Sequence, residues 1–303
     1  MGNLVINSEL LETYRVTLSK KFQDVYVATP PIEWPKVATL IESGSSRNDY
    51  SWLGEVSPMR KWVGPRVLDQ LSAYKYSIEN EPYEKTMAVK RTEIEDDAGG
   101  LFPLLGARAA TLARAVAQQP DRMVMIDTLA KGEEIPCFDG QPYFDTEHPV
   151  AQGSTQTYSN LLGTGTDPAW YLLDTSQPLR PVIYQSRKQA EFVGLFDLSA
   201  PNVFYNSEFV FGADSRVAAG FSLPWLCVKS TKPLNEANFI EASDLMASYT
   251  NDAGTKLGIS PDLLVVSKKN EWVARKLFNV DYLANGASNP LRGAIEIFVS
   301  RLL

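Results

Sequence analysis

Residues 74–89 contain two stretches of alternating apolar and polar side chains, separated by the turn-like sequence ENEP. The apolar phase contains Tyr74, Tyr76 and Ile78 before the turn, and Tyr83, Met87 and Val89 after it, with Lys85 in the same phase. Alternation with a period of two on both sides of a turn predicts a long antiparallel hairpin. Two strands alone are marginally stable, so this hairpin must be covered by another part of the chain or by another subunit.

Composition narrows the class of protein. The chain has 303 residues, of which 44% are hydrophobic and 21% charged, and this predicts a globular protein of roughly two domains. No apolar run approaches the ~20 residues of a membrane helix, and the N-terminus lacks the basic region of a secretion signal. We therefore expect no membrane association and no secretion. The net charge of -7 opposes general nucleic-acid binding, which needs a basic surface, but is compatible with a protein that only surrounds DNA.

The first residues predict a helix followed by a break. Apolar side chains recur at helical spacing over residues 3–22, and Asn7 or Ser8 is suited to cap the helix. The apolar positions are Leu4, Leu11, Tyr14, Leu18 and Phe22. The adjacent prolines Pro30 and Pro31 forbid regular helix. This pattern indicates an N-terminal arm that packs on another element.

A second, longer helical pattern follows the predicted hairpin. Its apolar stripe consists of Leu101, Leu104, Leu105, Ala109, Leu112 and Val116. Pro120 cannot donate a backbone hydrogen bond, which predicts a break or kink within about two residues of Gln119. Asp121 then lies near the start of the second segment, where the helix dipole favours its charge, and Gly132 ends the element. If Pro120 interrupts the helix, its replacement by alanine should stabilise it by ~3 kcal/mol.

The rest of the chain mixes strands and helices, which predicts an α+β fold. Residues 151–168 are rich in Gly, Ser and Thr and predict an exposed loop. Strands are expected within residues 169–174, 181–187, 191–198, 202–213 and 221–230. A helix at 235–249, a strand at 262–267, a helix at 270–279 and a final strand at 295–303 complete the prediction.

The stretch CFDGQPYFDTEHPV, residues 137–150, has the residue types of an active site. It contains Cys137, Asp139, Asp145, Glu147 and the only histidine of the chain, His148. Their spacing matches no metal-binding signature, whereas Asp139 followed by glycine is a strong turn signal. We therefore predict a structural turn without a metal. A metal-dependent hydrolase that uses Asp139, Asp145 and His148 is the less favoured alternative.

Other catalytic patterns are absent from the sequence. It contains no phosphate-binding glycine loop and no nucleophile elbow, and a single histidine removes the usual agent of acid–base catalysis. Cys137 lies among acidic residues, which oppose its activation as a thiolate. Cys137 and Cys227 form no disulfide framework and are expected to be small apolar residues in a reducing compartment. The sequence predicts a protein that is not an enzyme and has no cofactor.

The aromatic residues around the predicted hairpin suggest a different role. Because a hairpin cannot bury them and aromatic side chains are common interface anchors, we predict a contact between subunits. The predicted assembly-interface residues are Trp52, Trp62, Tyr74, Tyr76 and Tyr83.

Six segments, spread in order along nearly the whole chain, resemble the major head subunit, or T protein, of Mu-like phages. They are residues 49–64, 76–97, 137–150, 170–188, 203–225 and 256–266, from DYSWLGEVSPMRKWVG to KLGISPDLLVV. The resemblance implies the HK97-type capsid fold, with an N-terminal arm, an extended E-loop, a peripheral domain with a long spine helix and an axial domain. It places the arm at 1–47, the E-loop hairpin at 48–91, the peripheral domain with the spine helix and loop at 92–168, further peripheral strands and part of the axial domain at 169–233, and the α/β part of the axial domain at 234–303.

The resemblance also implies a function and partners. A chain of this family is expected to self-assemble into pentamers and hexamers, which form an icosahedral head shell around double-stranded DNA without sequence-specific binding. A separate scaffolding protein and a portal are implied, and a decoration protein is compatible with the family. The expected location is the virion capsid, and the host cytoplasm during assembly. A tail or tube structural protein built from similar hairpins remains an alternative.

Overall fold

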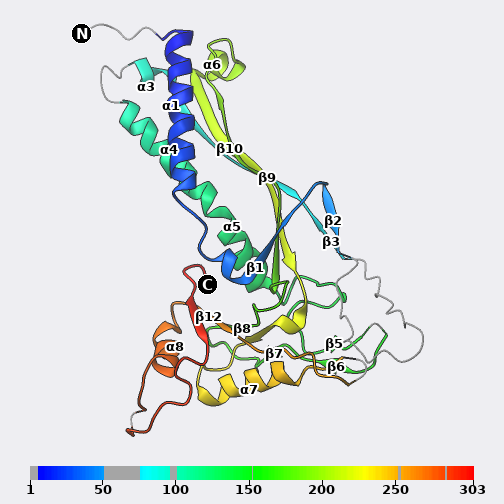
Figure 1. The fold of residues 1–303 in the computed structure, drawn as a ribbon. Coiled ribbons are helices and arrows are strands. Elements are labelled where there is room, and N and C mark those ends of the chain that lie inside the picture. The colour runs from blue at the N-terminus through cyan, green and yellow to red at the C-terminus, as the bar shows by residue number, and fades with distance from the viewer. Residues whose placement is uncertain (1–5, 51–75, 96–100, 152, 252–253, 284) are drawn as a thin grey trace.

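The structure is a computed structural model that describes residues 6–50, 76–95, 101–151, 153–251, 254–283 and 285–303. The molecule has two parts (Figure 1). A long body consists of two helices on an extended four-stranded sheet, and a lobe consists of a five-stranded sheet with two helices. No helix in the described ranges is both long and apolar enough to cross a membrane.

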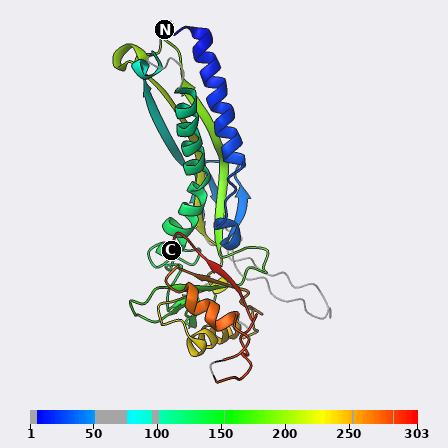
Figure 2. The same ribbon diagram turned by 90° about the vertical axis from the view of Figure 1, so that its left-hand side faces the viewer.

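The N-terminal helix α1 (Ser8–Val27) packs on its own subunit. Asn7 caps it by accepting a hydrogen bond from the backbone amide of Leu10 at 2.8 Å, as the sequence predicts. Four of the five predicted apolar positions, Leu11, Tyr14, Leu18 and Phe22, are buried against α4 and β9, and Leu4 lies outside the described residues. The turned view in Figure 2 shows α1 running beside α4 along the long body.

The predicted break in the spine helix is confirmed. Helix α4 (Leu101–Ala117) stops before Gln118, and α5 (Gln119–Arg122) begins with Pro120 and Asp121 in its first turn. A π-helical segment (Met123–Thr128) and a 3-10 turn (Leu129–Lys131) carry the chain to Gly132, where the element ends. Leu112 is fully buried, and Val116 is half-buried. The side chain of Leu104 lies outside the described part.

The position of Pro120 changes what its replacement should do. In the first turn of α5 its missing amide would have had no helical partner, so we expect Pro120→Ala to change the free energy of unfolding by less than ~1 kcal/mol. Gly106→Ala in α4 is a control on the same spine. An added Cβ there meets nothing within 4 Å, so this variant should stabilise by about 1 kcal/mol. Urea unfolding measures both, and a gain of ~3 kcal/mol for Pro120→Ala would restore the original expectation.

The sheet of the long body has the strand order β1 (Ala38–Glu42), β9 (Val182–Leu195), β10 (Glu208–Phe221) and β4 (Glu81–Lys90). β1 runs parallel to β9, and the other neighbours are antiparallel. β9 and β10 are each 14 residues long, so the strands predicted at 181–187 and 191–198 are one continuous strand. Helices α1 and α4 cover one face of this sheet (Figure 1).

The predicted hairpin across ENEP is wrong in its pairing. The short strand β3 (Ser77–Glu79) pairs with β2 (Arg47–Asp49), whereas β4 pairs with β10. The single residue between β3 and β4, Asn80, is buried, and its side-chain amide donates to Ser43 Oγ and to the backbone carbonyl of Ser45. The chain therefore stays extended here, and β4 obtains a ten-residue antiparallel partner in β10.

The strand predicted at 202–213 is wrong in its first half and correct in its second half. Residues 201–206 form a short helix, α6 (Pro201–Asn206), and the strand starts only at Glu208. Pro201 occupies the first turn of this helix, where proline is tolerated. Ser207 ends the helix in a left-handed conformation with φ 51°. The helix reverses the chain between β9 and β10, which a continuous strand could not do.

The lobe agrees with the predicted C-terminal order. Its sheet has the order β13 (Glu296–Val299), β12 (Leu263–Val266), β8 (Trp170–Leu173), β11 (Cys227–Ser230) and β7 (Leu161–Leu162). Helices α7 (Glu236–Ser248) and α8 (Glu271–Phe278) pack on the same core of this sheet, where the rings of Phe239 and Phe278 meet at 4.7 Å. The remaining short elements are α2 (Trp34–Val37), α3 (Arg91–Glu95), β5 (His148–Pro149), β6 (Thr157–Tyr158) and a 3-10 turn (Pro224–Leu226).

One strand connects the packed regions of the molecule. β10 contributes Phe209 and Phe211 to the core under α1 and α4. Val217 and Phe221 belong to a second core, which lies where the long body meets the lobe and is called the junction below. Ala218 belongs to the core of the lobe. The long body and the lobe are therefore joined through a shared strand rather than by a flexible linker.

Candidate functional site

The stretch at residues 137–148 forms a tight turn, as its Asp-Gly sequence predicts. The amide of Gly140 donates to the carbonyl of Cys137 at 3.1 Å, and the amide of Cys137 donates to the carbonyl of Gln141 at 2.8 Å. Gly140 has a φ of 87°, a conformation that glycine adopts without steric cost. The backbone alone closes this turn.

Asp139 is the centre of the hydrogen bonds inside the turn. Its carboxylate accepts from the Cys137 thiol at 3.0 Å, from the Gln141 amide at 3.0 Å and from His148 Nδ1 at 2.7 Å. Burial alone would raise the pKa of Asp139, but the hydrogen bonds from His148 and Cys137 outweigh it, and the pKa is lowered. The carboxylate is therefore held in its charged form.

His148 is held from both sides. Its Nε2 lies 3.1 Å from the carbonyl oxygen of Tyr143, and its ring stacks on Tyr158 with a centroid distance of 5.3 Å. Asn160 fixes the same Tyr143 carbonyl by donating to it at 2.7 Å. Both ring nitrogens thus face oxygen atoms, and these contacts fix the orientation of the ring.

The structure brings two of the three residues of the hydrolase alternative together and leaves the third apart. The side chains of Asp139 and His148 are in contact, whereas the Asp145 carboxylate turns back to the amides of Thr146 and Glu147 at 2.6 and 3.0 Å. His148 is fully buried. Burial and the neighbouring Asp139 raise the pKa of the Cys137 thiol, the opposite of what a nucleophile needs.

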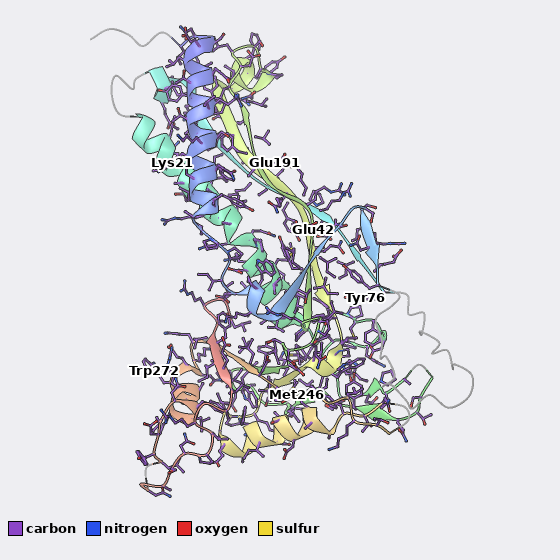
Figure 3. The ribbon with its side chains drawn as sticks, viewed as in Figure 1. Lys21, Glu42, Tyr76, Glu191, Met246 and Trp272 are labelled. Atoms are coloured by element: carbon purple, nitrogen blue, oxygen red, sulfur yellow. The ribbon has the colours of Figure 1, made fainter. Side chains whose placement is uncertain are left out.

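The predicted interface aromatics have different surroundings. Trp52, Trp62 and Tyr74 lie outside the described residues. Tyr76 packs inside its own subunit, where its hydroxyl accepts a hydrogen bond from the Phe221 amide at 2.9 Å, and burial raises its pKa. Figure 3 labels Tyr76 between the long body and the lobe. Tyr83 is half-buried on β4 and packs on the junction core.

Two groups of exposed aromatic side chains were not anticipated from the sequence. On α6, at the far end of the long body, Phe204 and Tyr205 are 79% and 80% exposed. In the lobe, Trp272 on α8 is 72% exposed and Tyr282 is 65% exposed, and Figure 3 shows Trp272 on the outer side of the lobe. A helical projection of residues 271–278 could have found Trp272, since Ala274 and Phe278 define the buried side. The rings of Phe204 and Tyr205 are in contact, with centroids 5.1 Å apart, so they form one exposed apolar group that is a candidate interaction surface.

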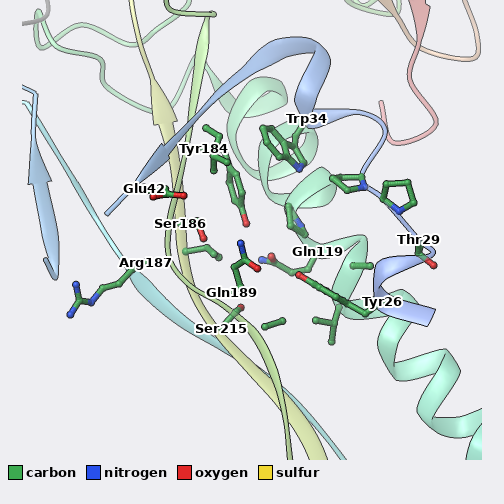
Figure 4. A pocket seen from close by; sticks show the side chains of 18 of the residues that line it. Tyr26, Thr29, Trp34, Glu42, Gln119, Tyr184, Ser186, Arg187, Gln189 and Ser215 are labelled. Atoms are coloured by element: carbon green, nitrogen blue, oxygen red, sulfur yellow. The ribbon is translucent and has the colours of Figure 1, made fainter. Parts of the chain in front are cut away.

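A pocket of about 500 Å³ lies in the long body, next to the junction with the lobe. It is bounded by the end of α1, the prolines that follow it, β9 and the break in the spine helix. Figure 4 shows the Tyr184 hydroxyl and the amides of Gln119 and Gln189 facing the same space. The indole nitrogen of Trp34, also in the lining, is buried without a hydrogen-bond partner. The pocket lies beside the spine break rather than at the turn of residues 137–148.

Solved structures give the class of protein to which this fold belongs. The chain matches a subunit of the procapsid of bacteriophage JBD30 with a TM-score of 0.81 and 38% identity over 98% of this chain and 100% of that one. It also matches a subunit of the JBD30 capsid with a TM-score of 0.77 and 30% identity over 98% and 99%. The class is therefore that of phage major capsid proteins, with the HK97-type α+β fold.

The family follows from the sequence comparisons. The family model for the Mu-like prophage major head subunit gpT matches residues 11–303. The major capsid protein of Escherichia phage Mu is 34% identical over 90% of this chain and 92% of its own length. The FluMu prophage major head subunit of Haemophilus influenzae is 32% identical over 90% and 89%. The chain belongs to the Mu-like major head subunit family: it is a structural protein of the virion head shell and not an enzyme, which confirms the resemblance noted in the sequence.

Proposed function

We propose that copies of this chain form pentamers and hexamers, which close into an icosahedral shell around double-stranded DNA. The observation that carries the proposal is the end-to-end match to the JBD30 capsid subunit, in both the procapsid and the capsid. The net charge of -7 supports the enclosure of DNA without tight binding, because a strongly basic inner wall would hold the phosphates. Assembly takes place in the host cytoplasm.

The shell requires partners that differ from the chain itself. We include a separate scaffolding protein and a portal, as the family resemblance implies. A decoration protein is supported by one relative, since a JBD30 capsid is described as decorated with minor capsid protein trimers. The exposed aromatic groups on α6 and α8 supply candidate contacts between subunits or with such partners.

Electron microscopy of the expressed chain, with and without its scaffolding partner, tests the proposal. Closed shells or five- and six-membered rings are the expected particles. Filaments or tubes of stacked rings would favour a tail-tube protein, and particles that stay monomeric in both preparations would contradict self-assembly.

The domain boundaries of the resemblance are part of the proposal. The arm spans residues 1–47, the E-loop 48–91 and the peripheral domain with the spine helix 92–168. Residues 169–233 add peripheral strands and part of the axial domain, which 234–303 complete. In the described residues, α1 and β1 of the arm already pack on the peripheral helix and sheet of the same subunit.

The E-loop is proposed to contact a neighbouring subunit through Trp52, Trp62, Tyr74 and Tyr83. The fifth predicted interface residue, Tyr76, is left out of this contact, because it packs inside its own subunit. We expect Trp62→Glu to leave the folded subunit intact and to prevent shell formation, because a charge cannot be buried at an apolar contact without large cost. Circular dichroism and thermal unfolding report folding, and sedimentation reports assembly.

Two further variants make this test specific. Trp62→Phe keeps an aromatic ring and should still assemble. Tyr76→Glu removes a ring that packs on the core of the lobe and buries a charge there, so it should reduce folding itself. Normal shells from Trp62→Glu would remove the E-loop tryptophan from the interface without affecting the family assignment.

A further inference from the structure

The turn of residues 137–148 brings three potential metal ligands together. A sulfur from Cys137, a carboxylate oxygen from Asp139 and a ring nitrogen from His148 lie within 4.8 Å of one another. Within the described residues this is the one group of three such side chains that the structure gathers so closely. The side chains of His148 and Asp139 are 0% and 3% exposed, and Cys137 is 3% exposed. The three side chains are thus almost completely buried.

The hydrogen bond of His148 to Tyr143 sets which ring nitrogen is available. A backbone carbonyl can only accept, so Nε2 carries a hydrogen and donates to Tyr143 at 3.1 Å. Asn160 holds that carbonyl in place at 2.7 Å. Metal-binding histidines characteristically donate their second N–H to a carbonyl or carboxylate in this way. The remaining nitrogen, Nδ1, points at Asp139.

A cation must lie between Nδ1 and Asp139. The two atoms are 2.7 Å apart, and the lone pair of a neutral ring would repel an ionised carboxylate at that distance. A proton removes the repulsion in the structure described above. A metal ion removes it equally well and can bind the Cys137 sulfur too, which lies 3.0 Å from the other carboxylate oxygen.

The donor set and the geometry suit zinc. Zinc takes thiolate, imidazole and carboxylate ligands at about 2.0–2.3 Å in a tetrahedral arrangement, which separates the ligand atoms by about 3.5 Å. The three ligand atoms, whose separations run from 2.7 Å to at most 4.8 Å, must therefore shift by about 1 Å to reach this spacing. The hydrogen bonds between backbone groups of the turn stay in place, since they do not involve the three ligand side chains.

We propose that Cys137, Asp139 and His148 bind one zinc ion, with a water molecule in the fourth position. The ion replaces the proton between His148 and Asp139 and the proton of the Cys137 thiol, so two protons are released for each zinc bound. The metal would fasten the turn to the start of β5. This goes beyond shell assembly, and it revises the expectation from the sequence, in which the spacing alone indicated a turn without a metal.

Cobalt(II) is the probe for the test, because it occupies zinc sites and absorbs light when a thiolate binds it. The full chain is washed with a chelator and titrated with cobalt. We expect one equivalent to bind with a thiolate-to-cobalt charge-transfer band, and zinc to abolish that band. Cys137→Ser should lose the band. Cys227→Ser is the matched control, since Cys227 is equally buried but has no place in the cluster, and it should keep the band.

A second variant, at the proposed ligand Asp139, keeps the test decisive even if Cys137→Ser does not fold. Asp139→Asn keeps the size of the side chain, and its cobalt affinity should fall at least about tenfold, because even the loss of an indirect partner of a metal site has that effect. Circular dichroism confirms that each variant is folded. Cobalt that binds without a charge-transfer band, a band that survives Cys137→Ser, or unchanged affinity in Asp139→Asn would overturn the proposal.

Discussion

Replacement of Asp121 by alanine is expected to destabilise the subunit by roughly 3 kcal/mol or more, through the loss of three backbone hydrogen bonds at a buried site. The carboxylate accepts from the amides of Ile32, Glu33 and Trp34 at 3.0, 3.1 and 2.8 Å. Asp121 itself is 7% exposed, so water cannot readily replace it. Urea unfolding of the isolated subunit measures the loss.

Asp121→Asn is the control for charge and shape. Its amide oxygen still accepts from one or two of these backbone groups, so its loss should be clearly smaller than that of the alanine variant. Hydrogen exchange at residues 32–34 should speed up in the alanine variant before the lobe is affected. A loss below about 1 kcal/mol for Asp121→Ala would show that these amides find other partners.

The second large effect is expected at Phe221, the last residue of β10. Its fully buried ring stacks on Tyr143 with a centroid distance of 3.8 Å and meets Phe144 edge-on at 6.3 Å. Phe221→Ala removes this ring from a packed core and should cost about 3–5 kcal/mol. Thermal and urea unfolding both report the change.

Phe221→Leu separates the contribution of the aromatic stack from that of the filled volume. Leucine fills most of the space, so we expect a cost of less than half that of alanine. Its backbone amide can still donate to Tyr76, as in the native chain. If alanine and leucine gave equal losses, the aromatic stack rather than the filled volume would dominate stability at the junction.

Sequence patterns predicted those helices and strands that are determined by residues close to one another in the chain. The stripe from Leu11 to Phe22 and the cap at Asn7 lie within one helix, and the break before Pro120 follows from the chemistry of proline. The order of strand, helix and strand in the lobe also follows from short apolar runs. In each case the neighbours in sequence carry the information.

Long-range pairing could not be predicted from such patterns. β4 has the alternation of a hairpin strand, but its partner β10 begins more than 100 residues later, and alternation is equally consistent with either pairing. The same holds for Asp121. Its place at the start of α5 was predicted from the helix dipole, whereas its contacts with residues 32–34 depend on the tertiary fold. At the turn, the distance between His148 and Asp139 likewise comes only from the structure.

The shared strand β10 also has a mechanical consequence. With β9 it forms a ladder of 14-residue strands, about 45 Å long, whose far end carries α6 and packs under α1 and α4 through Phe209 and Phe211. Its other end lies in the cores of the junction and of the lobe. Because α6 joins β9 to β10, a pull on α6 along the strands loads the hydrogen bonds to the outer strands β1 and β4 in parallel, so these bonds resist together. A sideways push on α6 is resisted first by the packing of α1 and α4 on the sheet and then by the aromatic rings around Phe221.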